Sequence, residues 1–129
     1  MNIVKKLDQL DAVRAVMQLY IDGADGDVAK LEQAFHPDAM MFGHVGETRR
    51  DMPISAFIKS VSDNGPGLCG KDYRFDLADI KIAGQAAVAT LVEQDYRGCE
   101  FVNFFTLAQI DGQWKIVSKT YSSTGGPFR

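Results

Sequence analysis

YRFDLADIKIAGQAAVATLVEQDYRGCEFVNFFTLAQIDGQWKIVSKTYSS is the sequence of residues 73–123, and its composition is that of long strands. Runs rich in valine, isoleucine, threonine and aromatic residues predict four strands: Tyr73–Ile82, Ala86–Arg97, Phe101–Ile110 and Trp114–Ser123. The links between them are short, and the last is Asp111-Gly112, a strong hairpin signal because both residues take positive φ. Since short links force neighbouring strands to run antiparallel, this half of the chain predicts an antiparallel meander.

Toward the N-terminus the apolar spacing changes from that of strands to that of helices. Apolar positions recur at helical spacing over residues 3–24, which predicts one amphipathic helix that ends near residue 23. Asp25 and Asp27 follow and are expected to supply the N-cap of a second helix. His36-Pro37 ends that helix, because proline has no amide to donate. We expect His36 to lie at the helix end, where a cation is favourable.

A third helix is expected after Pro53, which suits a helix start because it has no amide proton. Its apolar face consists of Ile54, Phe57, Ile58 and Val61. Between the second and third helices, the apolar run 39–45 predicts a strand, and residues 47–51 predict a short edge strand or a loop. Residues 64–70 contain three glycines and a proline and predict a loop. The tail 125–129 is expected to be loose.

Helices followed by an antiparallel meander indicate the α+β class. With 129 residues, of which 46% are hydrophobic, the chain suffices for one domain over residues 1–129 with one core. A curved sheet of four long strands, with short strands beside it, leaves a concave face that three helices of the N-terminal half cover only in part. The sequence therefore predicts a pocket between the helices and the sheet.

Charge and apolar patterning exclude several classes of function. The chain has 14 basic and 17 acidic residues and a formal charge of −3, so it lacks the basic excess that nucleic-acid binding needs. No apolar run is long enough to cross a membrane, and the charged N-terminus does not match a signal peptide. We expect a cytoplasmic protein with neither nucleic acid nor membrane as a partner. Cys69 and Cys99 are expected to be free thiols, with one bridge between them left open.

Two patterns that suggest cofactors or metals are set aside. Residues Gly65–Gly70 match GxGxxG, but they follow a helix and precede a strand, which is the reverse of the dinucleotide-binding arrangement. His36 and His44 are the two histidines, and no partners at metal-ligand spacing accompany them. Neither a cofactor nor a metal is expected.

The segments YIDGADGD (Tyr20–Asp27), FHPDA (Phe35–Ala39) and DGQWKIVSK (Asp111–Lys119) stand in an order and spacing similar to those of a known superfamily. They resemble nuclear-transport-factor-2-like proteins, and within them the putative lumazine-binding or SnoaL-like branch. The resemblance implies a cone-shaped α+β fold around a pocket, paired as a homodimer through the open sheet. The superfamily includes ketosteroid isomerase, polyketide cyclases and scytalone dehydratase, and also members without catalytic activity, so the fold leaves the function open.

Comparison with ketosteroid isomerase supplies catalytic candidates. Its first-helix tyrosine corresponds to Tyr20, its general-base aspartate falls near Gly43 beside His44, and its proton-donating aspartate falls near Asn103. Because glycine cannot accept a proton, the isomerase's own chemistry is not expected. His44 is the hypothetical replacement base, and it faces either the pocket or solvent. The Asn103 amide is a candidate hydrogen-bond donor to an oxyanion.

Alternation along the last expected strand allows two sets of inward residues. The resemblance favours Val117, Lys119 and Tyr121 in the pocket, with Trp114 and Ile116 on the opposite face.

Charged residues near this strand have two interpretations each. If Lys119 is inside, it meets an anionic ligand or pairs with Glu93 or Asp95; otherwise it is solvated, as most lysines are. Glu93 and Asp95 share one face of their strand, and our first interpretation places both acids in solvent. The second places a carboxyl group in the pocket with a raised pKa.

The expected ligand-binding set combines aromatic rings with a few polar groups, as small-molecule sites do. It consists of Tyr20, His44, Phe57, Asn103, Phe105, Val117, Lys119 and Tyr121. The first functional interpretation is a small-molecule-binding or accessory domain. The alternative is a cofactor-independent acid–base enzyme of isomerase, polyketide-cyclase or dehydratase type that acts on a compact cyclic substrate, with His44, Tyr20 and Asn103 as catalytic candidates. A third is an interaction module whose interior is filled by its own side chains.

Overall fold

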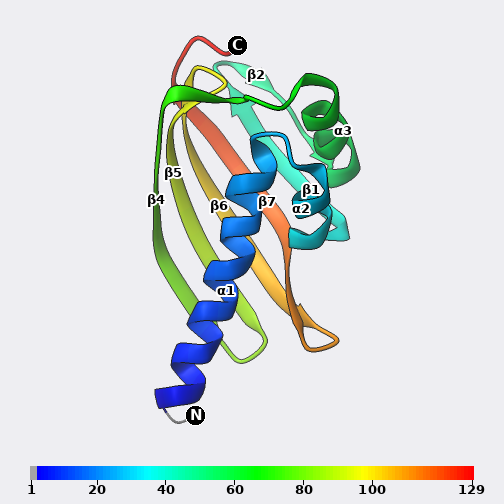
Figure 1. Cartoon of the computed structure of the whole chain (residues 1–129), viewed down its shortest axis with the longest axis vertical. Coiled ribbons are helices and arrows are strands. Elements are labelled where there is room, and N and C mark those ends of the chain that lie inside the picture. Colours follow the sequence, from blue (N-terminus) through cyan, green and yellow to red (C-terminus); the bar gives the residue numbers. More distant parts are fainter. Residues whose placement is uncertain (1–2) are drawn as a thin grey trace.

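The computed structural model describes residues 3–129, and in that range three helices accompany a seven-stranded sheet (Figure 1). The helices are α1 (Ile3–Ala24), α2 (Val28–Ala34) and α3 (Ile54–Asn64). The strands are β1 (Phe35–Val45), β2 (Thr48–Arg49), β3 (Met52–Pro53), β4 (Cys69–Ala83), β5 (Ala86–Tyr96), β6 (Cys99–Ile110) and β7 (Gln113–Gly125). Met1 and Asn2, which begin the charged N-terminal stretch, lie outside the described residues. The predicted α+β class is confirmed.

The four long strands form the predicted meander, in which β4, β5, β6 and β7 pair antiparallel in chain order. At the β6–β7 link, Asp111 and Gly112 have φ values of 52° and 80°, as a tight hairpin of this type requires. Arg97 and Gly98 make a similar turn between β5 and β6, with φ values of 50° and 83°. The hairpin prediction from Asp111-Gly112 is therefore confirmed.

Strand β1 adds a feature that the meander does not contain, because it pairs with β7 in parallel. The order across the sheet is β2-β1-β7-β6-β5-β4, and β3 pairs with β1 at the same end. A parallel pair needs a long connection, and here α3 and the strands β4, β5 and β6 lie between β1 and β7 in the chain. The sequence analysis gave β1 no pairing partner, and the structure places it beside β7.

Helix α1 lies across the inner face of the sheet and supplies the centre of the core (Figure 1). Its residues Val13, Met17 and Tyr20 are almost fully buried. At the far end of the sheet Trp114 Nε1 donates to Gln9 Oε1 at 2.7 Å, which fixes α1 to β7. Burying each such apolar side chain stabilises the fold by roughly 1.5–3 kcal/mol, so this helix holds the inner face together.

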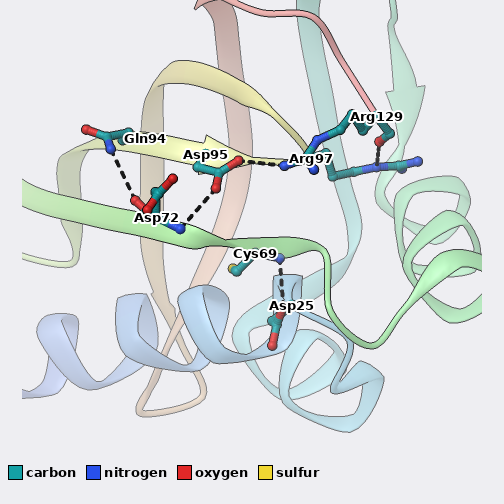
Figure 2. A network of polar contacts seen from close by, with 7 residues as sticks. All are labelled: Asp25, Cys69, Asp72, Gln94, Asp95, Arg97 and Arg129. Carbon is teal, nitrogen blue, oxygen red and sulfur yellow. Dashed lines mark hydrogen bonds and ion pairs between the residues drawn. The ribbon is translucent and has the colours of Figure 1, made fainter.

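The connection between α1 and β1 differs from the sequence-based expectation. Asp27 occupies the N-cap position of α2 but its side chain makes no capping hydrogen bond. Asp25 Oδ1 instead accepts a hydrogen bond from the Cys69 amide at 2.7 Å, across to the start of β4 (Figure 2). His36 lies within β1 rather than at a helix end, and its Nδ1 accepts from the Asp38 amide at 3.0 Å. Cys69 and Cys99 are both free thiols.

The face of the sheet turned away from α1, here called the outer face, exposes large apolar side chains. They are Met40, Phe42, Val88, Val92 and Phe104, with 39–55% of their surface exposed. Strand pairing aligns Phe42 with Thr120 and Phe104 in one row across β1, β7 and β6. These residues therefore share one face of the sheet, with Thr106, Ser118 and Thr120 between them. None of the helices within residues 3–129 has the length and apolar content that crossing a bilayer requires.

Candidate functional site

A cavity of about 60 Å³ lies between the inner face of β5–β7, the end of β1, α3 and the C-terminal tail. Its aromatic lining consists of Phe57, Tyr96, Phe101, Tyr121 and Phe128. Its charged lining consists of Arg50, Glu93, Arg97 and Lys119. Rings with a few convergent charges are the usual lining of a small-molecule site.

Glu93 is the buried acid of this cavity, with 3% of its surface exposed. Its Oε2 accepts a hydrogen bond from the Tyr73 hydroxyl at 2.7 Å, and its Oε1 accepts from Asn103 Nδ2 at 2.8 Å. Burial raises the pKa of the Glu93 carboxyl, while the Tyr73 hydrogen bond, the charge of Lys119 and the Asn103 hydrogen bond oppose this shift. The first interpretation, in which Glu93 faced solvent, is wrong.

A bulge separates Glu93 from Asp95, although the sequence places them on one face. The pairing of β5 with β6 shifts between Glu93 and Tyr96, and Asp95 has a φ of 59°. The extra residue lets both Glu93 and Tyr96 point inward, which strict alternation forbids. Tyr96 then lines the cavity and its hydroxyl donates to the Ala24 carbonyl at 2.8 Å.

Lys119 is the buried base of the cavity, with 4% of its surface exposed. Its Nζ lies 4.5 Å from the ring centroid of Tyr121, 4.6 Å from that of Phe57 and 5.3 Å from that of Tyr20. Burial lowers the pKa of Lys119 to about 8, against the upward influence of the Glu93 charge. The ring faces therefore stabilise a cation that has lost most of its hydration.

A second bulge, in β7, explains why Lys119 and Tyr121 are inside while Val117 is not on the cavity wall. Thr106 pairs with Ser118 but Leu107 pairs with Ile116, so Val117 is the extra residue. The placement of Lys119 and Tyr121 agrees with the expected set. The expectation that Trp114 and Ile116 lie on the opposite face is wrong, because the bulge turns them inward too, and both are buried.

Asn103 is at the cavity but its amide is already engaged. Its Nδ2 donates to the Leu91 carbonyl at 3.1 Å as well as to Glu93, so both amide hydrogens are used. In this structure the Asn103 amide therefore has no free hydrogen to donate to an oxyanion, and it holds the Glu93 carboxyl instead.

Tyr20 and Phe105 form the layer beneath the cavity. Their ring centroids are 4.8 Å apart, and Tyr20 stacks on Phe57 at 6.4 Å. Neither Tyr20 nor Phe105 lines the cavity directly, whereas Phe57 does. Burial, followed by the Glu93 charge, raises the pKa of Tyr20 well above its ordinary value, so its hydroxyl stays protonated. Tyr20 acts on the site through its ring, which lies against Lys119.

His44 faces solvent, which is one of the two alternatives that the sequence left open. It lies at the end of β1 on the outer face, paired with Arg49 and Ser122, and it is not part of the cavity. Its neighbour Gly43 points inward, where an added Cβ would come within 2.4 Å of the Tyr121 ring. The position that holds the isomerase base is therefore closed by an aromatic ring, and a base at His44 cannot replace it in this cavity.

The mouth of the cavity is built by residues that the sequence did not indicate. The guanidinium carbon of Arg50 lies 4.9 Å from the Phe128 ring centroid, and that of Arg97 lies 4.4 Å from it. Arg129 holds this segment: its amide donates to the Arg97 carbonyl at 2.6 Å and its side chain pairs with Asp95 at 2.8 Å (Figure 2). The expectation of a loose tail is therefore wrong.

The remaining contacts in this corner connect the tail to β4 (Figure 2). Asp95 Oδ2 accepts from the Asp72 amide at 3.1 Å, and Gln94 Nε2 donates to the Asp72 carbonyl at 3.2 Å. Arg97 Nε donates to the Arg129 carbonyl at 2.7 Å. Local sequence had no signal for this network, because it joins three distant parts of the chain: the start of β4, the end of β5 and the C-terminal tail.

Comparison with known proteins identifies the family and agrees with the fold. A family profile described as "Putative lumazine-binding" matches residues 8–122. Aldolase FrzH from Cladobotryum sp is 28% identical over 116 residues, which cover 89% of this chain and 91% of the relative.

Solved structures include close neighbours in fold. An NTF2-like protein of unknown function from Methylobacillus flagellatus KT superposes with a TM-score of 0.83 at 27% identity, over 97% of this chain and 96% of the other. An NTF-2 like protein of unknown function from Silicibacter pomeroyi DSS-3 has a TM-score of 0.82 at 24% identity, over 92% and 98%, and so shows the fold alone.

Proposed function

The chain belongs to the putative lumazine-binding family of the nuclear-transport-factor-2-like superfamily, and from this premise we propose that it binds a compact small molecule in the cavity around Lys119. The proposal rests on one observation: a buried ammonium group lines a cavity among three aromatic rings, with the buried Glu93 carboxyl on the same wall. Burying a charge without a partner is unfavourable. A ligand with a negatively charged or electron-rich group would supply the partner that the Lys119 ammonium group needs.

The chemistry of the lining defines the class of ligand. Phe57, Tyr96, Phe101 and Tyr121 offer ring faces and edges to a flat or cyclic molecule. Lys119 inside, with Arg50 and Arg97 at the mouth, favours a ligand with a carboxylate or another electron-rich oxygen. A compact aromatic acid fits both features.

Calorimetric titration with benzoate tests this function, with the uncharged analogue benzamide as the ligand control. We expect benzoate to bind more tightly than benzamide, and Lys119→Met to weaken benzoate binding at least tenfold. The matched control is Lys115→Met on the same strand, where Nζ donates to the Gln33 carbonyl at 2.6 Å outside the cavity. Equal affinity of Lys119→Met and wild type for benzoate, or no benzoate binding by the wild type at millimolar concentration, would contradict the proposal.

Cofactor-independent acid–base catalysis is the second candidate function, and the state of Glu93 favours it. A carboxyl group with a raised pKa, beside a cavity, can give a proton in one step and take it back in another. The relative named an aldolase is consistent with chemistry at a carbonyl compound. We expect the wild type, but not Glu93→Gln, to catalyse exchange of the α-protons of cyclohexanone in D₂O, followed by NMR. Equal exchange in both proteins would remove Glu93 from this role.

For the outer face we propose a second copy of the chain as the partner. The apolar patch formed by Met40, Phe42, Val88, Val92 and Phe104 supports this, since such patches mark association surfaces. The open sheet leaves this face uncovered in one chain (Figure 1).

A further inference from the structure

Lys119 is a desolvated amine at the wall of the cavity. It lies on the inner face of β7, its contacts at the Nζ end are with the rings of Tyr121, Phe57 and Tyr20, and it opens onto the cavity. No ion pair of Lys119 within 4.0 Å is found among residues 3–129. A lysine desolvated in an apolar pocket is a recognised type of nucleophile.

We infer that Lys119 condenses with the carbonyl group of a compact aldehyde or ketone, and that Glu93 supplies the proton with which the carbonyl oxygen leaves as water. This inference rests on the proposed small-molecule function of the same cavity and names its substrate class. The arginines at the mouth, Arg50 and Arg97, favour a carbonyl compound that also bears a carboxylate.

The bonds and protons of this step balance. The lone pair of the neutral Nζ attacks the carbonyl carbon, the π pair moves to oxygen, and one nitrogen proton passes to that oxygen to give a carbinolamine. The nitrogen lone pair then forms the C=N bond while the C–O bond breaks, and the protonated Glu93 gives its proton to the departing hydroxyl group. One amine, one carbonyl compound and one carboxylic acid give one iminium ion, one water and one carboxylate.

The groups around Lys119 favour both the neutral amine that begins the step and the iminium cation that ends it. A pKa near 8 leaves roughly one Lys119 amine in ten neutral at pH 7, against about one in 3,000 for an ordinary lysine. The titratable groups that face it are Glu93 of β5, Tyr20 of α1 and Tyr121 of β7, and both tyrosines have raised pKa values and stay neutral. The iminium cation therefore forms beside a single new carboxylate.

The Glu93 carboxyl is held for this role by its two hydrogen bonds, from Tyr73 at 2.7 Å and from Asn103 at 2.8 Å. These bonds hold the carboxyl group in one orientation at the cavity wall. Tyr73 and Asn103 are thus positioning residues, and Glu93 and Lys119 are the two groups that meet the substrate.

Reductive trapping tests the inference. The full chain is incubated at pH 7 with 4-carboxybenzaldehyde and sodium cyanoborohydride, and peptide mass mapping gives the rate of reduced adduct at each lysine. We expect Lys119 to be modified at least tenfold faster than Lys115, the matched control on β7. Lys119→Arg should lose the fast adduct, because a guanidinium group stays protonated and offers no neutral amine, and Glu93→Gln should slow trapping at Lys119 at least tenfold.

The outcomes separate this inference from the proposed function. Benzoate binding without preferential trapping at Lys119 would overturn the inference and leave the binding function standing. Failure of both benzoate binding and trapping would overturn both. Since Lys119→Arg could misfold, Lys119→Met serves as a second variant, and a fast adduct that persists in either folded variant would overturn the assignment to Lys119.

Discussion

At the residue scale, the charge state of Lys119 links the site to stability. The pKa of Lys119 is about 8 in the folded chain and near 10.5 when exposed, so between these values the unfolded chain binds more protons and stability rises with pH. Over pH 8 to 10 this contribution amounts to about 2 kcal/mol.

Denaturant unfolding at several pH values measures this contribution. We expect the unfolding free energy of the wild type, relative to that of Lys119→Met, to rise by about 2 kcal/mol from pH 8 to pH 10. Other groups that titrate in this range, such as Cys69 with its pKa raised to about 12, are present in both proteins and cancel in the difference. A difference that stays constant with pH would mean that Lys119 is hydrated in the folded chain.

Gly43 gives a second prediction at the residue scale. An added Cβ would meet the Tyr121 ring at 2.4 Å and the Tyr121 carbonyl at 2.5 Å, and backbone cannot yield as a flexible side chain would. Gly43→Ala should therefore destabilise the fold by about 1–3 kcal/mol, as measured by denaturant unfolding. The exposed neighbour on β1 provides the control, and His44→Ala should stay within about 0.5 kcal/mol of wild type. Equal effects of the two substitutions would contradict the placement of the Tyr121 ring.

At the element scale, the bulge in β7 makes adjacent residues unequal. Ile116 is fully buried, whereas Val117 is the extra, half-buried residue of the bulge. Ile116→Ala should cost about 2–5 kcal/mol and Val117→Ala about 1 kcal/mol or less. The reverse order of the two unfolding free energies would show that β7 pairs with β6 in the unbulged register.

The C-terminal tail gives a second prediction at this scale. Phe128 is held between Arg50 and Arg97, and Arg129 is paired with Asp95, so the tail is ordered at the cavity mouth. Phe128→Ala should increase hydrogen exchange at the amide of Arg129 at least tenfold, with a global stability cost of only about 1 kcal/mol because the contacts are at the surface. Thr124→Ala, just before the tail, should leave that exchange rate unchanged. Unchanged exchange in Phe128→Ala would show that the Arg129 contacts hold the tail alone.

The elements themselves show which features a sequence can predict. The helices and meander follow from local periodicity and from the Asp111-Gly112 turn, and these were predicted correctly. The parallel pairing of β1 with β7 was not, because it is decided between segments far apart in the chain. The two bulges were not predicted either. Each shifts the alternation of side chains by one residue, and no local residue pattern indicates it.

The candidate site was predicted in part for the same reason. Lys119, Tyr121, Phe57 and Asn103 were named and do line the cavity. Glu93 was placed in solvent because acids on strands usually are. Glu93 pairs with Phe101 on β6, and Phe101 shares a face of that strand with Asn103, which was expected in the pocket. That pairing places Glu93 on the inner face. Arg97 and Phe128 depend on where the tail folds back, which sequence spacing does not encode.

At the scale of the whole molecule, the two faces of the sheet differ in what covers them. Helices and tail cover the inner face and leave the cavity around Lys119, while the outer face presents apolar side chains of β1, β5 and β6. Val88 aligns through Thr106 and Ser118 with Met40, and Phe104 aligns through Thr120 with Phe42. A second copy that covers these rows would leave the cavity mouth free, because Arg50, Arg97 and Phe128 lie on the inner side.

This arrangement predicts that association and ligand binding can be separated by mutation. Phe104 is 55% exposed at the centre of the patch, and Phe104→Glu should convert a dimer into a monomer in native mass spectrometry, because a carboxylate buried without a partner is strongly unfavourable. Leu7→Glu is the matched control, since Leu7 is 54% exposed on α1 and away from the sheet. A wild-type monomer, or dimers in both variants, would contradict an interface on the outer face. If Phe104→Glu is a folded monomer that still binds benzoate with wild-type affinity, each chain holds a complete site; if it loses benzoate binding while folded, the partner copy is needed to hold the cavity in shape.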